Sequence, residues 1–553
     1  MSKGGKRVGL LGAFIVIGMF SSLGMAGQVY HVSPSGNDSA SGSASSPWKT
    51  IGKAAGAAVA GDTVIIHAGI YHESLSPQNS GTSESARITF QAAAGEEVIL
   101  EGGTAQLKGW TPIGNNIYQI NLSSQAFGVF QDTFETLGMH ATLWDMEFNQ
   151  YDSNPNYDLH DFDPSHDYYG GIQDDAHKKH DWRSQFKWAN GVLRVRTVDG
   201  LSPDQHNVRA AISRTAIAID GKSYITLSGI KTRHWRNSAT VDNCRAIRFE
   251  YMDMRYSGYT SMWVTNTRDF TMVHSVVQGG GSGVGHYEDA IDCKNNTSGT
   301  LTFEDNDISQ AGHCGLIVLD GLGSHLVVRR NWIHDNSGSA LTMKRDNNDG
   351  IFEDNLLQAP DITKVNCHKV DHDGVQLSGD RNVFRRNLFY RSGNGLAVSC
   401  SDTQTSNNGL FEYNTFAHFN FEAILLEAYD AQYQGRLNNN VFRNNIFVDA
   451  KASLLWLDIP GGESTAFWGN TFVNNVFHDG TIHPWTACGS GCAVDYAQSH
   501  WPTVFQGNID VDPMFVNDSG NDYHLKPGSP AVGKGVYGSG VPAPPKSLRI
   551  LAN

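Results

Sequence analysis

The sequence predicts an all-β protein, a right-handed single-stranded parallel β-helix, from two patterns that recur along the chain. The first is a phrase of one aromatic or aliphatic residue, two polar residues and an asparagine, which occurs seven times between residues 303 and 475. Its asparagines are 25, 24, 32, 27, 31 and 30 residues apart. Short β-type runs repeated at this period are typical of a solenoid in which each coil is one repeat. The asparagines are Asn306, Asn331, Asn355, Asn387, Asn414, Asn445 and Asn475.

Stacking explains why asparagine would recur at one place in every coil. Neighbouring coils lie about 4.8 Å apart, so each side-chain amide can hydrogen-bond to the next one along a ladder. Asparagine also adopts the left-handed backbone conformation more readily than most residues. We therefore expect these asparagines to take the sharp turn between two strands. A propeller or a sandwich with asparagine-rich turns is the alternative architecture.

The second pattern lies between the asparagines, where a small residue precedes four residues of alternating character. Examples are Ala290-Ile-Asp-Cys-Lys294 and Ala340-Leu-Thr-Met-Lys344. The second and fourth members are almost always apolar, so strand alternation points them into the coil and points the third and fifth outward. One outer face of the solenoid is therefore predicted to carry polar and charged side chains. Its predicted outward members include Asp292, Lys294, Thr342, Lys344, Gln376, Ser378, Leu425 and Glu427.

The N-terminus predicts export from the cell. Residues 1–26 combine Lys3, Lys6 and Arg7 with an apolar run and a small-residue cleavage site, which is typical of a secretory signal peptide. We expect a secreted protein, extracellular or periplasmic, without a membrane-spanning segment, and we expect it to be a monomer. Removal of these residues would change the formal charge from −15 to −18. So acidic a chain is a poor nucleic-acid binder.

After the signal peptide the chain divides into four predicted parts. They are an N-terminal cap with the first coils at 27–105, a coil with an aromatic-rich insertion at 106–212, the β-helix core with the active groove at 213–480, and C-terminal coils with a tail at 481–553. Within the cap, the alanine-rich segment 51–60 is predicted to be helical, because a short helix can cover the open end of a solenoid. The segment 61–71 is predicted to be a strand.

The chain has seven cysteines, and export makes disulfides possible. Cys488 and Cys492 could close a small loop. Cys293 falls at an inward position of its strand, which favours core packing.

Residues 125–205 interrupt the repeat and are rich in aromatic residues, among them Trp144, Tyr151, Tyr168 and Trp188. Two interpretations remain open. The insertion could fold over the groove and offer aromatic faces to sugar rings. It could equally be a packed side lobe.

The opening of the mature chain resembles that of secreted carbohydrate-active β-helix proteins, including the glycoside hydrolase family 120 xylosidases and the pectate-lyase-like enzymes. The resemblance covers about the first 75 mature residues and rests on five short segments. It implies a β-helix that acts on carbohydrate, and it leaves the reaction open. The segments are Tyr30-His-Val, Gly36-Asn-Asp38, Pro47-Trp-Lys-Thr-Ile51, Ala60-Gly-Asp-Thr-Val-Ile-Ile66 and Gly69-Ile-Tyr71.

Three carboxylates, Glu288, Asp289 and Asp292, are predicted to converge within one coil. Hard oxygen ligands in such a cluster suit Ca²⁺. The cluster resembles the Asp-Asp-x-x-Asp calcium site of the family 9 pectate lyases, with glutamate in place of the first aspartate. The resemblance implies a Ca²⁺ cofactor held by these three residues.

A basic cluster lies on the same predicted face. Lys344 stands outward two coils beyond Lys294, and Arg345 follows it. A β-elimination enzyme must neutralise a uronate carboxylate and remove a proton with a base, and lysine or arginine is the usual base in pectate-lyase-like folds. We therefore predict a lyase that acts on an acidic polysaccharide, with Lys344 as base and with Arg345 and Lys294 as supporting cations.

Further polar residues follow along the predicted groove. Those assigned a catalytic role are His313 and Asp320, and those assigned to substrate binding are His372, Asp373, Gln376 and Glu427.

Two other functions remain open. A glycoside hydrolase needs two carboxylates that flank the scissile bond. Family 120 places its two catalytic carboxylates at the outward strand ends of adjacent coils. Only Glu427 is acidic at these positions in this chain, so the residues of that family do not transfer. Asp320 and Asp292 could form a different pair. A non-catalytic carbohydrate-binding or adhesin solenoid is the remaining alternative.

Overall fold

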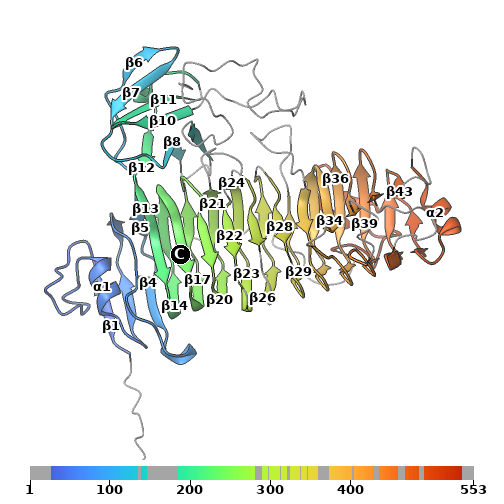
Figure 1. Cartoon of the computed structure of the whole chain (residues 1–553), viewed down its shortest axis with the longest axis horizontal. Helices are drawn as coiled ribbons and strands as arrows, with labels where there is room; N and C mark the ends of the chain where they lie inside the picture. The colour runs from blue at the N-terminus through green and yellow to red at the C-terminus, as the bar shows by residue number, and fades with distance from the viewer. Residues whose placement is uncertain are drawn as a thin grey trace, which may run out of the picture.

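The computed structural model describes residues 27–134, 139–145, 185–197, 199–280, 289–296, 298–311, 313–319, 324–336, 338–345, 347–358, 373–400, 404–428, 435–458, 468–484 and 491–537. These residues form a right-handed parallel β-helix, as predicted (Figure 1). In each full coil the chain passes through one strand in each of three parallel sheets and then begins the next coil. The predicted signal peptide lies outside the described residues.

The three sheets have 14, 13 and 11 strands within the described ranges. Sheet 1 contains β1 (Val29–Val32), β2 (Thr63–Ile66), β4 (Ile88–Ala92), β14 (Ser223–Ser228), β17 (Arg245–Glu250), β20 (Arg268–Val273), β23 (Gly299–Glu304), β26 (Ser324–Arg329), β29 (Ile351–Glu353), β32 (Val383–Arg385), β35 (Leu410–Glu412), β38 (Val441–Arg443), β41 (Thr471–Val473) and β44 (Phe505–Gln506). Sheet 2 contains β3 (Gly69–Tyr71), β5 (Val98–Glu101), β15 (Ile230–Arg233), β18 (Asp253–Arg255), β21 (Val276–Gly280), β24 (Asp307–Ala311), β27 (Trp332–His334), β30 (Leu356–Leu357), β33 (Leu388–Ser392), β36 (Thr415–Phe419), β39 (Ile446–Ala450), β42 (Val476–His478) and β45 (Ile509–Asp510). Sheet 3 contains β13 (Ser213–Asp220), β16 (Trp235–Asp242), β19 (Met262–Thr265), β22 (Ile291–Lys294), β25 (Leu316–Leu319), β28 (Leu341–Lys344), β31 (Asp373–Leu377), β34 (Asn394–Cys400), β37 (Ile424–Ala428), β40 (Leu455–Asp458) and β43 (Ile482–Pro484).

Stacked apolar side chains fill the interior of the solenoid. Phe352, Phe384, Phe411 and Phe442 occupy the same register position in four successive strands of sheet 1 and are all buried. Their ring centroids are 4.3, 5.4 and 4.4 Å apart in sequence order, and the rings are nearly parallel. Because each ring is covered by the next, every coil depends on its neighbours for burial of its apolar surface.

The asparagine ladder forms as predicted and gains one further member. Each Nδ2 donates to the Oδ1 of the next asparagine, as in the 2.9 Å bond from Asn355 to Asn387. The same Nδ2 donates to a backbone carbonyl of the preceding coil, and the Oδ1 accepts a backbone N–H. The ladder therefore satisfies main-chain groups at a buried corner, where water cannot reach them. Its members are Asn306, Asn331, Asn355, Asn387, Asn414, Asn445, Asn475 and Asn508.

The left-handed turn, however, falls on the residue before each ladder asparagine. Asp354, Arg386 and Tyr413 have φ values of 60°, 55° and 57°, whereas no ladder asparagine has positive φ. The prediction that the asparagines themselves take this conformation is wrong. The physical reason is that the asparagine amide must point into the stack to reach the next coil, so the preceding residue makes the turn and keeps its side chain outside.

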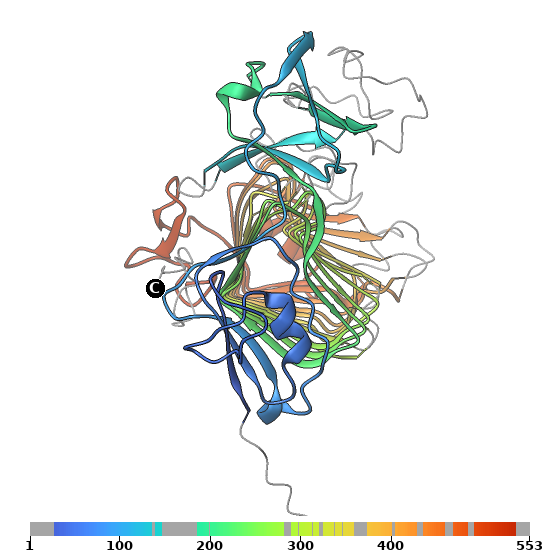
Figure 2. The same ribbon diagram turned by 90° about the vertical axis from the view of Figure 1, so that its left-hand side faces the viewer.

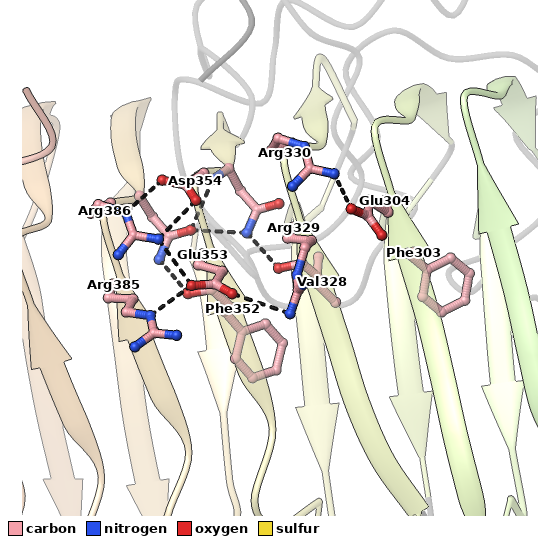
Figure 3. A network of polar contacts seen from close by, with 12 residues as sticks. Phe303, Glu304, Val328, Arg329, Arg330, Phe352, Glu353, Asp354, Arg385 and Arg386 are labelled. Atoms are coloured by element: carbon pink, nitrogen blue, oxygen red, sulfur yellow. Dashed lines mark hydrogen bonds and ion pairs between the residues drawn. The ribbon is translucent and has the colours of Figure 1, made fainter. Parts of the chain in front are cut away.

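Outside this turn, charged side chains alternate in sign from coil to coil (Figure 3). Glu304, Arg329, Glu353 and Arg385 stand opposite one another in adjacent strands of sheet 1. Glu353 lies between two guanidinium groups, with Oε1 3.2 Å from Arg329 and Oε2 2.6 Å from Arg385. Since coils are about 4.8 Å apart, like charges at this position would repel strongly. The alternation of charge thus places an oppositely charged neighbour beside each of these side chains in the stack.

The two N-terminal elements differ from the prediction in one respect. Helix α1 (Ile51–Ala57) begins after Thr50, whose side chain accepts the Lys53 backbone N–H, and it lies across the end of the solenoid (Figure 2). The segment 61–71 is not one strand, because β2 belongs to sheet 1 and β3 to sheet 2. The corner between them falls at His67 and Ala68, where the chain turns into the next sheet.

A separate seven-stranded sheet projects from one side of the solenoid near its N-terminal end (Figures 1 and 2). Phe186 is fully buried in the core of this lobe, and Trp188 donates from Nε1 to the Leu122 carbonyl at 2.8 Å. These two aromatic residues therefore pack within the lobe, while residues 146–184 lie outside the described part. Its strands are β6 (Thr111–Gly114), β7 (Ile117–Asn121), β8 (Gly128–Phe134), β9 (Met139–Asp145), β10 (Gln185–Ala189), β11 (Val192–Arg196) and β12 (Val208–Ala211).

The C-terminal segment folds back against sheet 2. After helix α2 (Val494–His500), the hairpin of β46 (Phe515–Asn517) and β47 (Asp522–Leu525) places Phe515 and Tyr523 against Tyr390 in one buried cluster. Among the described residues no helix is long and apolar enough to cross a membrane. Cys293 is buried in the core as predicted, and Cys492 is disulfide-bonded, while Cys488 lies outside the described residues.

Candidate active site on sheet 3

Two rows of outward side chains run along sheet 3, with one residue from each strand. The register agrees with the predicted alternation and places Lys344 two coils beyond Lys294, roughly 10 Å along the solenoid. The first row contains Trp263, Asp292, Ile317, Thr342, Gln376, Ala397, Leu425 and Trp456. The second row contains Thr265, Lys294, Leu319 and Lys344.

The outward side chains differ sharply in exposure. Lys344 and Arg345 are exposed at the end of β28, and the Arg345 backbone N–H donates to Ser378 Oγ at 3.1 Å. Asp292 and Thr342 also point outward, yet each is only 1% exposed. Strand alternation sets the direction of a side chain but not what covers it, so these two side chains point outward as predicted and are nevertheless buried.

Asp292 and Lys294 form a close ion pair on β22. The Lys294 Nζ lies 2.7 Å from Asp292 Oδ2 and 4.6 Å from the centre of the Trp263 ring. Lys294 is therefore the counter-ion of a buried carboxylate, rather than a free cation for the substrate. Burial and repulsion by Asp289 raise the pKa of Asp292 to about 7, although Lys294 and His313 favour its charged form.

This raised pKa leads to a prediction for the pH dependence of stability. An unfolded aspartate titrates near pH 3.9, so folded Asp292 binds its proton more tightly than the unfolded chain does. Its stabilising contribution is fully present below about pH 4 and is lost as the pH rises through about 7. We expect the free energy of unfolding of Asp292→Asn, relative to wild type, to increase by roughly 2–4 kcal/mol across this window.

Denaturant unfolding of both proteins from pH 4 to pH 8 in chelator-containing buffer measures this difference. The attraction between Lys294 and ionised Asp292 is already contained in the pKa of Asp292, so it adds no separate contribution to this difference. Parallel stability curves for the two proteins would show that Asp292 titrates normally.

At the entrances of β22 and β25, Asp289, His313 and Cys314 form a buried polar cluster. The Asp289 Oδ1 is 2.8 Å from His313 Nδ1 and accepts the Cys314 backbone N–H at 2.9 Å. The Cys314 Sγ is 3.6 Å from His313 Nε2 and 3.3 Å from Thr342 Oγ1. A carboxylate, an imidazole and a thiol in contact can transfer protons or bind a metal ion.

Asp373 occupies the strand entrance that corresponds to Asp289 in a later coil. Its two carboxylate oxygens accept hydrogen bonds from Gln376 Nε2 at 2.9 Å and Asn394 Nδ2 at 2.7 Å. Two coils beyond Asp373, burial together with repulsion by Asp373 raises the pKa of Glu422. Asp373 and Gln376 therefore bind each other, and any contact with substrate would compete with this bond.

The structure brings some of the predicted site residues together and separates others. Asp289, Asp292, Lys294 and His313 come together in one cluster, whereas Glu427 lies on β37, three coils beyond Lys344. The sequence reasoning missed the functional potential of Cys314, Thr342 and Trp263. The adjacent imidazole and thiol at residues 313–314 were the signal that could have found this cluster. The predicted site residues outside the described part are Glu288, Asp320 and His372.

The donor atoms around Asp289 and Asp292 can be compared with those that a calcium ion requires. Ca²⁺ takes six to eight oxygen ligands, typically carboxylates, carbonyls and water. Of the three predicted ligands, Asp289 already accepts two hydrogen bonds through Oδ1, Asp292 is ion-paired with Lys294, and Glu288 is not described. Imidazole and thiol groups lie among these carboxylates, so the described donors fit a softer ion better than calcium. Calcium stays a prediction.

The architecture is that of a right-handed parallel β-helix. Residues 215–361 and 350–525, together more than half of the chain, match the family described as right handed beta helix region. The chain belongs to this family. Residues 34–78 also match a family described as a protein of unknown function, DUF1565.

Three known proteins resemble this chain over different shares of its length. Over 77 residues the chain is 39% identical to the uncharacterized protein YwoF of Bacillus subtilis (strain 168), a match that spans 14% of this chain and only 16% of that protein. The structure of XylC with xylose aligns with a TM-score of 0.50 and 15% identity over 88% of this chain and 87% of that one. Pectate lyase Pel9A aligns with a TM-score of 0.42 and 12% identity over 92% and 91%.

Proposed function

We propose that this protein is a secreted enzyme that cleaves a uronic-acid-containing polysaccharide by β-elimination on the outer face of sheet 3. One observation carries the proposal. Lys344 and Arg345 are exposed, whereas the nearby carboxylates Asp289, Asp292 and Asp373 are buried. Among the described residues at this place, the charged groups that can reach a polymer are therefore cations, which suit an anionic substrate on an otherwise acidic protein.

The reaction assigns separate roles to the two exposed cations. The neutral amine of Lys344 removes the proton from C5, next to the uronate carboxylate. The electron pair left on C5 forms the C4–C5 double bond, and the oxygen at C4 departs with the bonding pair and takes up a proton from water. Arg345 pairs with the uronate carboxylate and stabilises the charge that develops on it during proton removal.

The Asp292–Lys294 pair lies two coils from this centre. Above it, the Trp263 ring is partly exposed and takes the ammonium of Lys294 on one face. Sugar rings pack their C–H faces against aromatic rings. A polymer that follows the rows of sheet 3 would therefore meet Trp263 a few sugar units from Lys344, given roughly 5 Å per coil.

A glycoside hydrolase is the second candidate, because one observation favours it. The pKa of Asp292 is raised to about 7, and a carboxyl group that holds its proton at neutral pH can act as a general acid. Both Asp292 and its neighbour Asp289 are nearly inaccessible, however, and a hydrolase must bring two carboxylates to the scissile bond.

The products distinguish these functions. We expect incubation with polygalacturonate, alginate or glucuronate-containing polymers to release oligosaccharides with the ultraviolet absorbance of an unsaturated uronate, one double bond for each new reducing end. A heat-inactivated sample is the control. Reducing ends without this absorbance would replace the lyase by a hydrolase, and retention of polymer without cleavage would indicate a binding protein.

A further inference from the structure

The geometry points to a binding site for a borderline transition-metal ion of the Zn²⁺ class at His313, Cys314 and the carboxylates beside them. The site lies next to the proposed reaction centre, but the inference does not depend on the lyase activity. It rests on the donor atoms, their spacing, their hydrogen bonds and their burial.

The spacing of the donor atoms matches a tetrahedral metal site. The Cys314 Sγ and His313 Nε2 are 3.6 Å apart. Zinc lies about 2.3 Å from thiolate sulfur and about 2.0–2.1 Å from imidazole nitrogen, so two such ligands at a tetrahedral angle are roughly 3.5–3.6 Å apart. One donor atom from each of Asp289, His313 and Cys314 lies within 4.8 Å of the other two.

Asp289 holds the imidazole in the orientation that a metal site requires. Its Oδ1 lies 2.8 Å from His313 Nδ1, and the Cys314 backbone N–H fixes the same oxygen. Metal-binding histidines generally donate their second ring N–H to a carboxylate or carbonyl, which sets the tautomer and aims the other nitrogen at the metal. With Nδ1 turned to Asp289, Nε2 is the nitrogen that faces Cys314.

Asp292 supplies an independent indication that a cation binds here. It is only 1% exposed, and neither of its carboxylate oxygens accepts a hydrogen bond of good geometry from a described residue. Its described cationic partner is Lys294, and it interacts electrostatically with both Asp289 and His313. Among the described residues, Lys294 is the cation that pairs with this group of two buried carboxylates and a thiol, so a divalent cation bound at His313 and Cys314 would balance the charge.

The kind of donor selects the kind of metal. A thiolate is a soft ligand and an imidazole an intermediate one, and together with carboxylate they favour Zn²⁺, Co²⁺ and similar ions. Ca²⁺ prefers a larger shell made only of oxygen atoms. The site is therefore expected to bind Co²⁺ and Zn²⁺ in the presence of excess Ca²⁺.

Cobalt serves as the probe, because thiolate ligation to Co²⁺ gives a charge-transfer band that Ca²⁺ and Zn²⁺ do not give. The chelator-treated full-length protein is titrated with Co²⁺, and we expect this band to saturate at one ion per chain and to disappear when Zn²⁺ is added. Cys314→Ser keeps a hydroxyl beside Thr342 but removes the thiolate, and it should abolish the band. Asp289→Asn should weaken Co²⁺ binding by about 10–100-fold.

Cys400→Ser is the matched control, because Cys400 is another free, buried cysteine of sheet 3, on β34. This variant should keep the band, and circular dichroism checks that all variants are folded. A band that is missing in wild type, or that persists in folded Cys314→Ser, overturns the inference. Displacement of Co²⁺ by Ca²⁺ at equal concentration overturns the choice of metal class. Absence of unsaturated products with an intact band overturns only the proposed lyase activity.

Discussion

Replacement of Lys344 by alanine is expected to lower kcat on the cleaved polymer by about 10²–10⁴-fold, the usual contribution of a general base. KM should change little, because Arg345 and the neighbouring row still contact the substrate. Lys344 is exposed and lies at the end of its strand, so its removal leaves no buried cavity and no unpaired buried charge. Initial rates of unsaturated-product formation at several polymer concentrations separate kcat from KM.

Lys231→Ala provides the control for loss of a surface lysine. Lys231 lies on sheet 2 and pairs with exposed Glu97 at 2.6 Å, away from the proposed site. This variant should retain normal kcat. If Lys344→Ala also retains it, Lys344 is not the base, and the reaction must use a residue outside the cationic pair.

Replacement of Asn387 by alanine is expected to lower the free energy of unfolding by about 3–5 kcal/mol. Its Oδ1 accepts both the backbone N–H and the Nδ2 of Asn355, and its Nδ2 donates to the Phe352 carbonyl and to Asn414. All of these groups are buried. Each group left without a partner costs about 1–3 kcal/mol, so the loss should exceed that of an ordinary polar truncation. The midpoint of denaturant unfolding measures the effect.

Asn420→Ala is the matched control, because the Asn420 side chain accepts one bond from Lys451 at the surface. Its stability should stay within about 0.5 kcal/mol of wild type. A similarly small effect for Asn387→Ala would mean that water replaces the amide inside the corner, and that the ladder does not stabilise the coils.

Much of the fold follows from local regularity that the sequence displays directly. Each coil contains the same asparagine and the same alternation of apolar residues. Because the coils stack about 4.8 Å apart, identical side chains at the same position contact each other and stabilise the stack. The order of residues along sheet 3 follows from the same alternation. The alternation alone therefore predicts that Lys344 lies two coils beyond Lys294, and the register of sheet 3 confirms it.

The alternation of charge between successive repeats is visible in the sequence, but only the stacked coils show which charged residues pair. The phrases Phe-Glu-Asp-Asn and Val-Arg-Arg-Asn alternate in charge, and in the structure Glu353 and Arg329 pair across neighbouring coils (Figure 3). The stacked coils also explain why the prediction for the turn beside the ladder is wrong. Asparagine adopts the left-handed backbone conformation readily, but this preference does not decide whether the asparagine or the polar residue before it makes the turn.

The sequence by itself determined the solenoid, the direction of its side chains and the face that carries the charged groups. Only the tertiary structure decided that Asp292 and Thr342 are buried, that Lys294 neutralises Asp292, and that His313 and Cys314 meet Asp289. The physical reason is that strand periodicity is a local property, repeated every two residues and every coil. Burial, ion pairing and pKa depend instead on groups from other coils, whose approach no local pattern specifies.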